Sequence, residues 1–180
     1  MKGTRSLFRL LLLIVALGIG ALALMQAPVG PPPVKDAPPL VGQIDRILVE
    51  KAARRLTVFQ DGKAVRHYRI ALGFAPEGDK VRQGDGRTPE GTFRINRRNG
   101  QSRFHLSLGL DYPQADDVKR ARTGGYDPGG DIMIHGQPNS LAGKPTLRRD
   151  WTAGCIALSD AEIEELWRVT PVGTLVEIRR

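Results

Sequence analysis

The sequence predicts a mainly β domain with a β-sandwich-like or barrel-like sheet and one helix in its C-terminal region. Three observations support this fold class: seven short segments with strand character, a hairpin turn signal at Asp61-Gly62, and no regular alternation of strands with helices. Strands joined by short turns form antiparallel sheets, whereas βαβ repeats would indicate a parallel sheet. The length of 180 residues allows one such domain plus a terminal segment.

The expected strands alternate apolar and polar residues or are rich in β-branched residues. They cover residues 44–50, 55–60, 64–72, 92–96, 104–110, 131–135 and 174–178. Asp61-Gly62 is expected to join the second and third strands as a hairpin. Ser159 and Glu162 form a capping-box pattern, which predicts the start of the one expected helix. Residues 116–122 also have the composition of a short helix, but the fold that we expect includes only the helix that starts at Ser159.

The first 27 residues are organised like a signal peptide or a membrane anchor. Lys2, Arg5 and Arg9 precede an uncharged apolar run over residues 10–25, which is expected to form an N-terminal apolar helix. The run is slightly long for a signal peptide and short for a membrane span, so both alternatives stay open. The positive flank predicts that the remaining chain is exported to the periplasm or cell envelope, anchored in the inner membrane by residues 10–27 if the signal is not cleaved.

A proline-rich segment separates this N-terminal region from the expected domain. Six prolines lie between residues 26 and 40, so residues 28–41 are expected to form a semi-rigid linker, followed by a folded domain over residues 42–180. The net charge is +8, and removing the three N-terminal basic residues leaves +5. A basic exported surface favours an anionic cell-wall polymer over nucleic acid as partner, although a merely solvated surface is the alternative.

The one cysteine of the chain, Cys155, lies between small residues and an apolar run, and His135 ends an expected strand. A single cysteine cannot form an internal disulfide in an oxidising compartment. A lone cysteine with a histidine elsewhere in the chain is a candidate nucleophile–base pair. The alternative is a buried structural thiol. Export favours the catalytic interpretation, in which Cys155 and His135 carry out thiol acyl transfer.

The neighbours of Cys155 suggest how an acyl intermediate could be held. The backbone amides of Ala153, Gly154 and Cys155 are candidate oxyanion donors. Thr152 belongs to the same short run, which would let the backbone approach a substrate carbonyl. Gly136, directly after His135, is expected to leave room for the substrate.

Charged and polar residues elsewhere are less specific. Arg148 and Arg149 could bind a substrate carboxylate or form a solvated pair on a loop. His67 and His105 fall on the polar faces of their strands, which favours solvent-facing roles. Residues 73–91 are rich in Gly, Pro and charge and predict a long loop, a type of segment that is often functional. With no cluster of cysteines and histidines, a metal site is not expected.

Two motifs together resemble a known family. Ile134-His135-Gly136, followed by Thr152-Ala153-Gly154-Cys155-Ile156-Ala157-Leu158, resembles the signature of the L,D-transpeptidase catalytic domain (the YkuD family). Thr88-Pro89-Glu90-Gly91-Thr92-Phe93 is similar to the Thr-Pro-x-Gly-x-Phe segment of that family, and the resemblance covers residues 43–179.

The resemblance implies a β-sandwich-like fold and action on peptidoglycan stem peptides that contain meso-diaminopimelate. In the family, the cysteine attacks the diaminopimelate carbonyl, D-alanine leaves, and an amine of a second stem accepts the acyl group from the thioester. Cys155 would be the nucleophile and His135 the base and acid, with no cofactor.

The chain departs from the common pattern at two positions. Ala157 stands where an arginine is usual two residues after the cysteine, and Thr152 replaces a serine. The run Asp-Trp-Thr-x-Gly-Cys-Ile-Ala resembles a sub-branch in which some members release a lipoprotein from peptidoglycan. The acceptor therefore stays open between an amine, as in a transpeptidase, and water, as in an L,D-carboxypeptidase or amidase. A non-catalytic wall-binding module is the third alternative.

Overall fold

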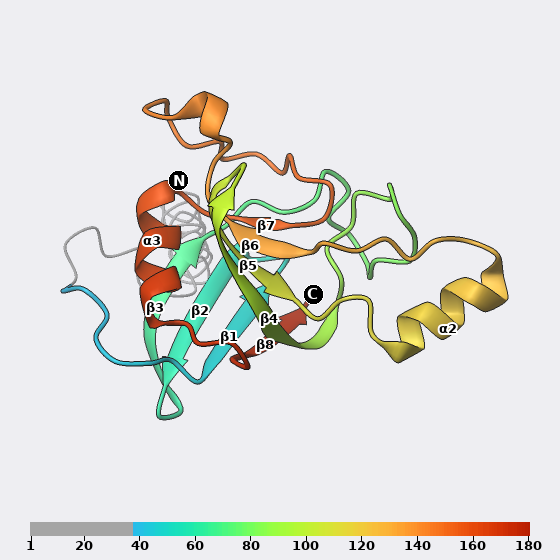
Figure 1. Ribbon diagram of the computed structural model, residues 1–180, viewed down its shortest axis with the longest axis horizontal. Helices are drawn as coiled ribbons and strands as arrows, with labels where there is room; N and C mark the ends of the chain where they lie inside the picture. The colour runs from blue at the N-terminus through green and yellow to red at the C-terminus, as the bar shows by residue number, and fades with distance from the viewer. Residues whose placement is uncertain (1–37) are drawn as a thin grey trace, which may run out of the picture. The chain divides into compact units, whose positions relative to one another are not determined.

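The computed structural model describes residues 38–180 (Figure 1). The signal or anchor expected over residues 1–27, the N-terminal apolar helix included, and the linker as far as residue 37 lie outside the described residues. Within residues 38–180, every helix is too short or too polar to cross a bilayer.

Residues 38–180 contain eight strands, two α-helices and one short 3₁₀ helix. The strands are β1 (Arg46–Glu50), β2 (Arg55–Gln60), β3 (Lys63–Arg69), β4 (Gly91–Ser102), β5 (His105–Leu110), β6 (Met133–His135), β7 (Ile156–Ala157) and β8 (Leu175–Arg179). The helices are α2 (Ala115–Gly124), η1 (Asn139–Leu141) and α3 (Asp160–Val169).

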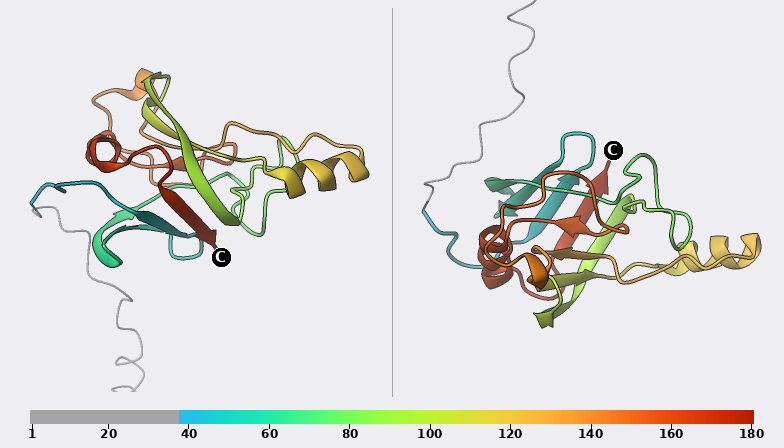
Figure 2. Two further views of the ribbon diagram at one scale, coloured as in Figure 1. Left: turned by 60° about the horizontal axis from the view of Figure 1, so that its bottom comes forward. Right: turned by 90° about the horizontal axis from the view of Figure 1, so that it is seen from above.

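The eight strands form one curled sheet in the order β3-β2-β1-β8-β4-β5-β6-β7. The long strand β4 belongs to both halves of the sheet, because its first residues pair with β8 and its later residues pair with β5. Figure 2 shows how the two halves face each other. The predicted mainly β, sandwich-like fold is confirmed in this form.

The two ends of the sheet meet near the end of β3. Ala71 donates to the carbonyl of Ala157 at 2.9 Å, and Ala157 donates back to the carbonyl of Ala71 at 2.8 Å. Ala157 is the second residue of β7 and also pairs with β6. This contact fixes β7, and with it the segment that carries Cys155, against the opposite end of the sheet.

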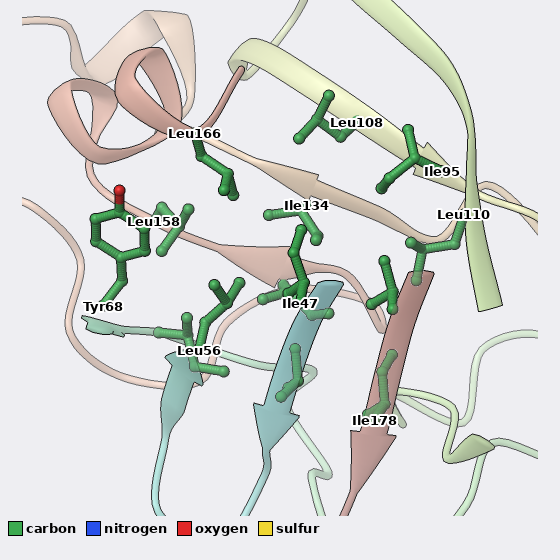
Figure 3. Close-up of a cluster of buried hydrophobic side chains, with 14 of the residues drawn as sticks. Ile47, Leu56, Tyr68, Ile95, Leu108, Leu110, Ile134, Leu158, Leu166 and Ile178 are labelled. Carbon is green, nitrogen blue, oxygen red and sulfur yellow. The ribbon is translucent and has the colours of Figure 1, made fainter. Parts of the chain in front are cut away.

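The core lies between the facing halves of the sheet (Figure 3). Ile47 and Leu56 come from one half, and Leu108 and Ile134 come from the other; all four are fully buried. Leu166 of α3 completes the packing, because this helix lies against β5 and β6. Burying an aliphatic side chain of this size contributes roughly 1.5–3 kcal/mol, so this core holds β5 and β6 firmly in place.

Two local predictions are confirmed. Asp61 and Gly62 both have positive φ, at 51° and 72°, and join β2 to β3 as the hairpin turn. Ser159 caps α3, since its hydroxyl accepts from the Glu162 amide while the Glu162 side chain accepts from the Ser159 amide.

The expected single helix is wrong, because α2 is a second helix of ten residues. Asp116 and Asp117 lie in its first turn and Gly125, with φ of 70°, ends it in the left-handed conformation. Figure 1 shows α2 projecting from the sheet on the side away from α3. Only Ala121 of this helix is buried, which explains why its apolar pattern was weak in the sequence.

Candidate active site

Strands β6 and β7 place Cys155 and His135 on the same face of the sheet. They run parallel, with Ile134 paired to Ile156 and His135 paired to Ala157. Both isoleucines are fully buried in the core. Because side chains alternate between faces, His135 of β6 and Cys155, directly before β7, both lie on the opposite face, offset by two positions. The two residues predicted to be catalytic are therefore diagonal neighbours.

The imidazole of His135 is fixed in one orientation. Nδ1 donates to the carbonyl of Gly136 at 2.7 Å, which leaves Nε2 as the unprotonated nitrogen of the neutral ring. Phe104 stacks on the ring with centroids 4.5 Å apart, and Trp151 meets it edge-on at 5.7 Å. A histidine held in this tautomer can accept a proton through Nε2.

Burial determines the protonation state of the histidine. His135 is 2% exposed, and the loss of hydration lowers the pKa of its imidazole, while the Gly136 carbonyl opposes the shift. A pKa below the ordinary value leaves the ring neutral at pH 7. The histidine is therefore in the form that a general base requires.

The half-buried thiol of Cys155 is protonated at neutral pH. Its Sγ donates to the carbonyl of Asp131 at 3.4 Å. Desolvation raises the pKa of the thiol and so does the Asp131 charge, whereas the Met133 amide, Lys80 and Arg97 act in the lowering direction. At rest, Cys155 is therefore a neutral thiol and His135 a neutral imidazole. Attack by Sγ requires that the thiol proton is first transferred to a base.

The reactivity of Cys155 is expected to depend on pH accordingly. We expect its alkylation by iodoacetamide to rise about tenfold per pH unit between pH 7 and pH 9, because the thiolate is the reacting form and the thiol pKa lies above its usual value. The rate would be followed by mass spectrometry of the single-cysteine protein. A rate already constant above pH 6 would indicate a preformed thiolate–imidazolium pair and contradict this assignment.

Thr152 shapes the turn that precedes the thiol. Its hydroxyl donates to the Cys155 carbonyl at 2.7 Å and accepts from the Gly154 amide at 3.1 Å. The Gly154 amide is thus engaged inside the turn and is not available to an oxyanion in this arrangement. The prediction that the Gly154 amide donates to the oxyanion is therefore wrong. The amides of Ala153 and Cys155 remain the proposed oxyanion donors. A substrate-binding role of Thr152 stays a prediction.

The loop over residues 73–91 packs against this turn through glycines. A Cβ atom at Gly154 would lie 2.7 Å from the carbonyl oxygen of Arg87, and one at Gly73 would lie 3.1 Å from Gly154 Cα. Gly154 also has φ of 140°, which other residues rarely adopt. Thr88 is fully buried and its hydroxyl accepts from the Gly73 amide at 3.3 Å. Arg87 and Thr88 of this loop therefore support the position of the Cys155 turn.

Gly136 serves close packing. A Cβ atom at this position would lie 2.6 Å from Asp160 Oδ1 and 3.0 Å from a methyl group of Ile163, both in α3. The space that we expected to admit the substrate is filled by the helix, so this expectation is wrong. The glycine instead lets α3 approach β6, and its carbonyl orients His135.

Arg148 and Arg149 lie on an exposed segment, and His67 and His105 have hydrogen-bond partners of their own. Arg148 and Arg149 are both exposed on the segment after η1, and they are not among the groups that most affect the thiol pKa. His67 bonds Thr57 at 2.9 Å, and His105 pairs with Glu164 at 2.7 Å. Substrate binding by the two arginines stays a prediction.

Several residues at the site were missed in the sequence. Phe104 and Trp151 contact the imidazole, Asp131 contacts the thiol, and Arg97 pairs with Asp131. Trp151 stands four residues before Cys155 and was the one available signal. The others come from separate elements and are brought together only by the pairing of strands.

Comparison with known proteins identifies the family of this chain. The model of the L,D-transpeptidase catalytic domain (YkuD) matches residues 44–178. The chain belongs to this family. Among curated proteins, the candidate L,D-transpeptidase YafK of Escherichia coli (strain K12) is 27% identical over 143 residues, which are 76% of this chain and 51% of that protein. This L,D-transpeptidase-family chain thus spans about half the length of the curated relative.

Solved structures share the fold. The helical cell shape determining protein Pgp2 (K307A mutant) from Campylobacter jejuni aligns with a TM-score of 0.61 and 27% identity, over 77% of this chain and 48% of that one. An L,D-transpeptidase from Xylanimonas cellulosilytica aligns with a TM-score of 0.51 and 16% identity, over 83% and 65% of the two chains. The match to the Xylanimonas cellulosilytica protein shows a shared fold only. The sub-branch assignment stays a prediction.

Proposed function

We propose that this domain is a cysteine-dependent L,D-transpeptidase that acts on peptidoglycan stem peptides containing meso-diaminopimelate. The main support is the diagonal placement of Cys155 and His135 on one face of the sheet, with Nδ1 of the histidine occupied and Nε2 unprotonated. Membership of the L,D-transpeptidase family supports the substrate class.

The proposed reaction proceeds through a thioester. Nε2 of His135 takes the thiol proton as Sγ of Cys155 attacks the diaminopimelate carbonyl carbon. The amides of Ala153 and Cys155 donate to the oxyanion of the tetrahedral intermediate. The carbon–nitrogen bond then breaks, and His135 returns the proton to the departing D-alanine amine. An amine of a second stem attacks the thioester, forms a 3→3 cross-link and restores the thiol.

Hydrolysis is the second candidate, and Ala157 is the observation that favours it. This residue pairs with His135, is 2% exposed, and stands where the family pattern has an arginine. A methyl group there supplies neither the charge nor the hydrogen bonds of a guanidinium, so the hold on an acceptor stem is weaker. Water would then resolve the thioester, as in an L,D-carboxypeptidase or an amidase that releases lipoprotein.

Product analysis on defined tetrapeptide muropeptides in H₂¹⁸O tests the proposal. Transfer gives dimers and free D-alanine without ¹⁸O in the acyl product, whereas hydrolysis gives tripeptide monomers that carry ¹⁸O in the new carboxylate. A lipoprotein-linked muropeptide tests the amidase. Absence of D-alanine release, of lipoprotein release and of any acyl adduct on Cys155 would contradict thioester chemistry and favour the wall-binding module.

This function requires access to the cell wall. We therefore propose an exported protein of the periplasm or cell envelope, in line with the basic and apolar pattern over residues 1–27.

A further inference from the structure

A row of residues crosses the outer face of the sheet and ends at the thiol. Arg97 of β4 pairs with Gly109 of β5, and Gly109 pairs with Met133 of β6. Cys155 is level with Met133, because the next residues of the two strands, Ile134 and Ile156, are paired. All four residues therefore lie in one row on the face opposite the core.

Gly109 lets the arginine reach along this row. A Cβ atom at Gly109 would lie 2.7 Å from Cγ and 3.0 Å from Cζ of Arg97, so the arginine side chain lies directly over the glycine. Three strand spacings separate the Arg97 and Cys155 backbones, about 14 Å, and the extended arginine covers a large part of this distance. Any larger residue at position 109 would block this path.

Asp131 connects the guanidinium to the thiol. Its carboxylate binds Nη2 of Arg97 at 2.7 Å, and its backbone carbonyl accepts from Sγ of Cys155 at 3.4 Å. The side chains of Arg97 and Asp131 are 42% and 86% exposed. An ion pair as exposed as this contributes little to stability, so another carboxylate can replace Asp131.

Lys80, a further cation that acts on the thiol, is not available in this way. Lys80 is 2% exposed, and its amine is bound to the Asp85 carboxylate at 2.9 Å and to the Arg82 carbonyl at 3.1 Å. Its charge is therefore neutralised inside the loop over residues 73–91. Arg97 is the exposed cation of the two.

From this geometry we infer that Arg97 binds a peptide carboxylate of the donor next to the scissile bond. This inference rests on the proposed function. The carboxylate of the leaving D-alanine lies one residue, about 3.8 Å of backbone, beyond the scissile bond. The second carboxylate of diaminopimelate is the other source of the same chemistry. Asp131 holds the guanidinium until the donor arrives.

Alkylation of the thiol tests the anion site without any peptidoglycan substrate. Iodoacetate is an anion and iodoacetamide is neutral, so the ratio of their rates on Cys155 measures local charge and cancels the thiolate fraction. We expect Arg97→Gln to lower this ratio about threefold or more, and Asp131→Asn to raise it, with both effects shrinking at high salt. Arg94→Gln is the matched control, since Arg94 lies on the same strand where β4 pairs with β8.

Donor analogues test the binding role and identify the carboxylate. We expect Arg97→Gln to lower kcat/KM about 10- to 100-fold on a tetrapeptide with free carboxylates, as expected for loss of a charge-assisted hydrogen bond. If Arg97 binds the carboxylate of the leaving D-alanine, a donor with a C-terminal amide should give the same kcat/KM with Arg97→Gln as with the unsubstituted enzyme. If Arg97 binds the second carboxylate of diaminopimelate, amidation of that carboxylate should have this effect instead.

Two results would overturn the inference. One is an iodoacetate to iodoacetamide ratio that Arg97→Gln and Arg94→Gln change equally. The other is an equal loss of kcat/KM on all three peptides, which would indicate a structural defect. Failure of the unsubstituted enzyme to act on any tetrapeptide would instead count against the proposed function, and the alkylation ratio would still decide on the anion site.

Discussion

Replacing Cys155 by alanine is expected to abolish D-alanine release from tetrapeptide muropeptides. No other thiol exists in the chain to take over as nucleophile. Removing the nucleophile of an acyl-transfer enzyme lowers kcat by at least about 10⁴-fold, with the remainder due to substrate positioning. Release of D-alanine would be measured by mass spectrometry. The mass of the protein would also be measured after exposure to a carbapenem, which we expect to acylate Cys155 only.

Cys155→Ser is the matched variant for this experiment. The hydroxyl has nearly the shape of the thiol but a much higher pKa, so the fold is kept while nucleophilic attack is lost. We expect both variants to unfold at nearly the temperature of the unsubstituted protein. Full activity of Cys155→Ala, or a carbapenem adduct on that variant, would show that the thiol is not the nucleophile.

The second large effect is expected at His135. His135→Gln preserves a side chain of similar size but cannot accept the thiol proton, so acylation at pH 7 should fall about 10²- to 10⁴-fold. The loss should shrink above pH 9, where solvent removes the thiol proton without help from the base. Single-turnover acylation across pH 6–10 would measure both effects.

The chain offers two histidine controls. His67 bonds Thr57 between β2 and β3, and His105 pairs with Glu164 on the surface. His67→Gln and His105→Gln should therefore keep acylation within about twofold of the unsubstituted enzyme, since surface substitutions of this kind change little. Equal losses in all three variants, or unchanged acylation in His135→Gln at pH 7, would remove the assignment of His135 as base.

His135→Gln also needs a test of folding, because the residue is buried. Iodoacetamide alkylation of Cys155 at pH 10 provides it, since the thiolate forms there without a base. A variant that alkylates normally at pH 10 but acylates slowly at pH 7 has lost proton transfer alone. A variant that is slow in both reactions has a disturbed site, and the conservative change His135→Asn would then be compared.

Much of the fold could be predicted because its signals are local. The positive φ values at Asp61 and Gly62 are those that the sequence Asp-Gly permits, and the capping box at Ser159 needs only residues three apart. The β7 strand could not be predicted, because two residues carry no periodicity. Ile156 and Ala157 become a strand only where β6 and Ala71 provide partners.

The candidate site divides in the same way. Cys155 and His135 could be recognised as candidate catalytic residues because their side-chain chemistry and short flanking motifs can be read directly from the sequence. The surroundings of the two residues could not be inferred. Gly136 was expected to face the substrate but meets α3, and the Gly154 amide was expected to be free but is bound by Thr152. Such facts depend on how distant elements pack.

The sequence by itself determined the β-rich domain, its hairpin and helix cap, and the candidates for nucleophile and base. The tertiary structure alone decided which charge stands beside the thiol. Arg97 lies 58 positions before Cys155, and a register shift between Ile95 and Arg97 places it opposite Gly109. Moving that register by one residue would turn the guanidinium to the other face of the sheet, because side chains alternate along a strand.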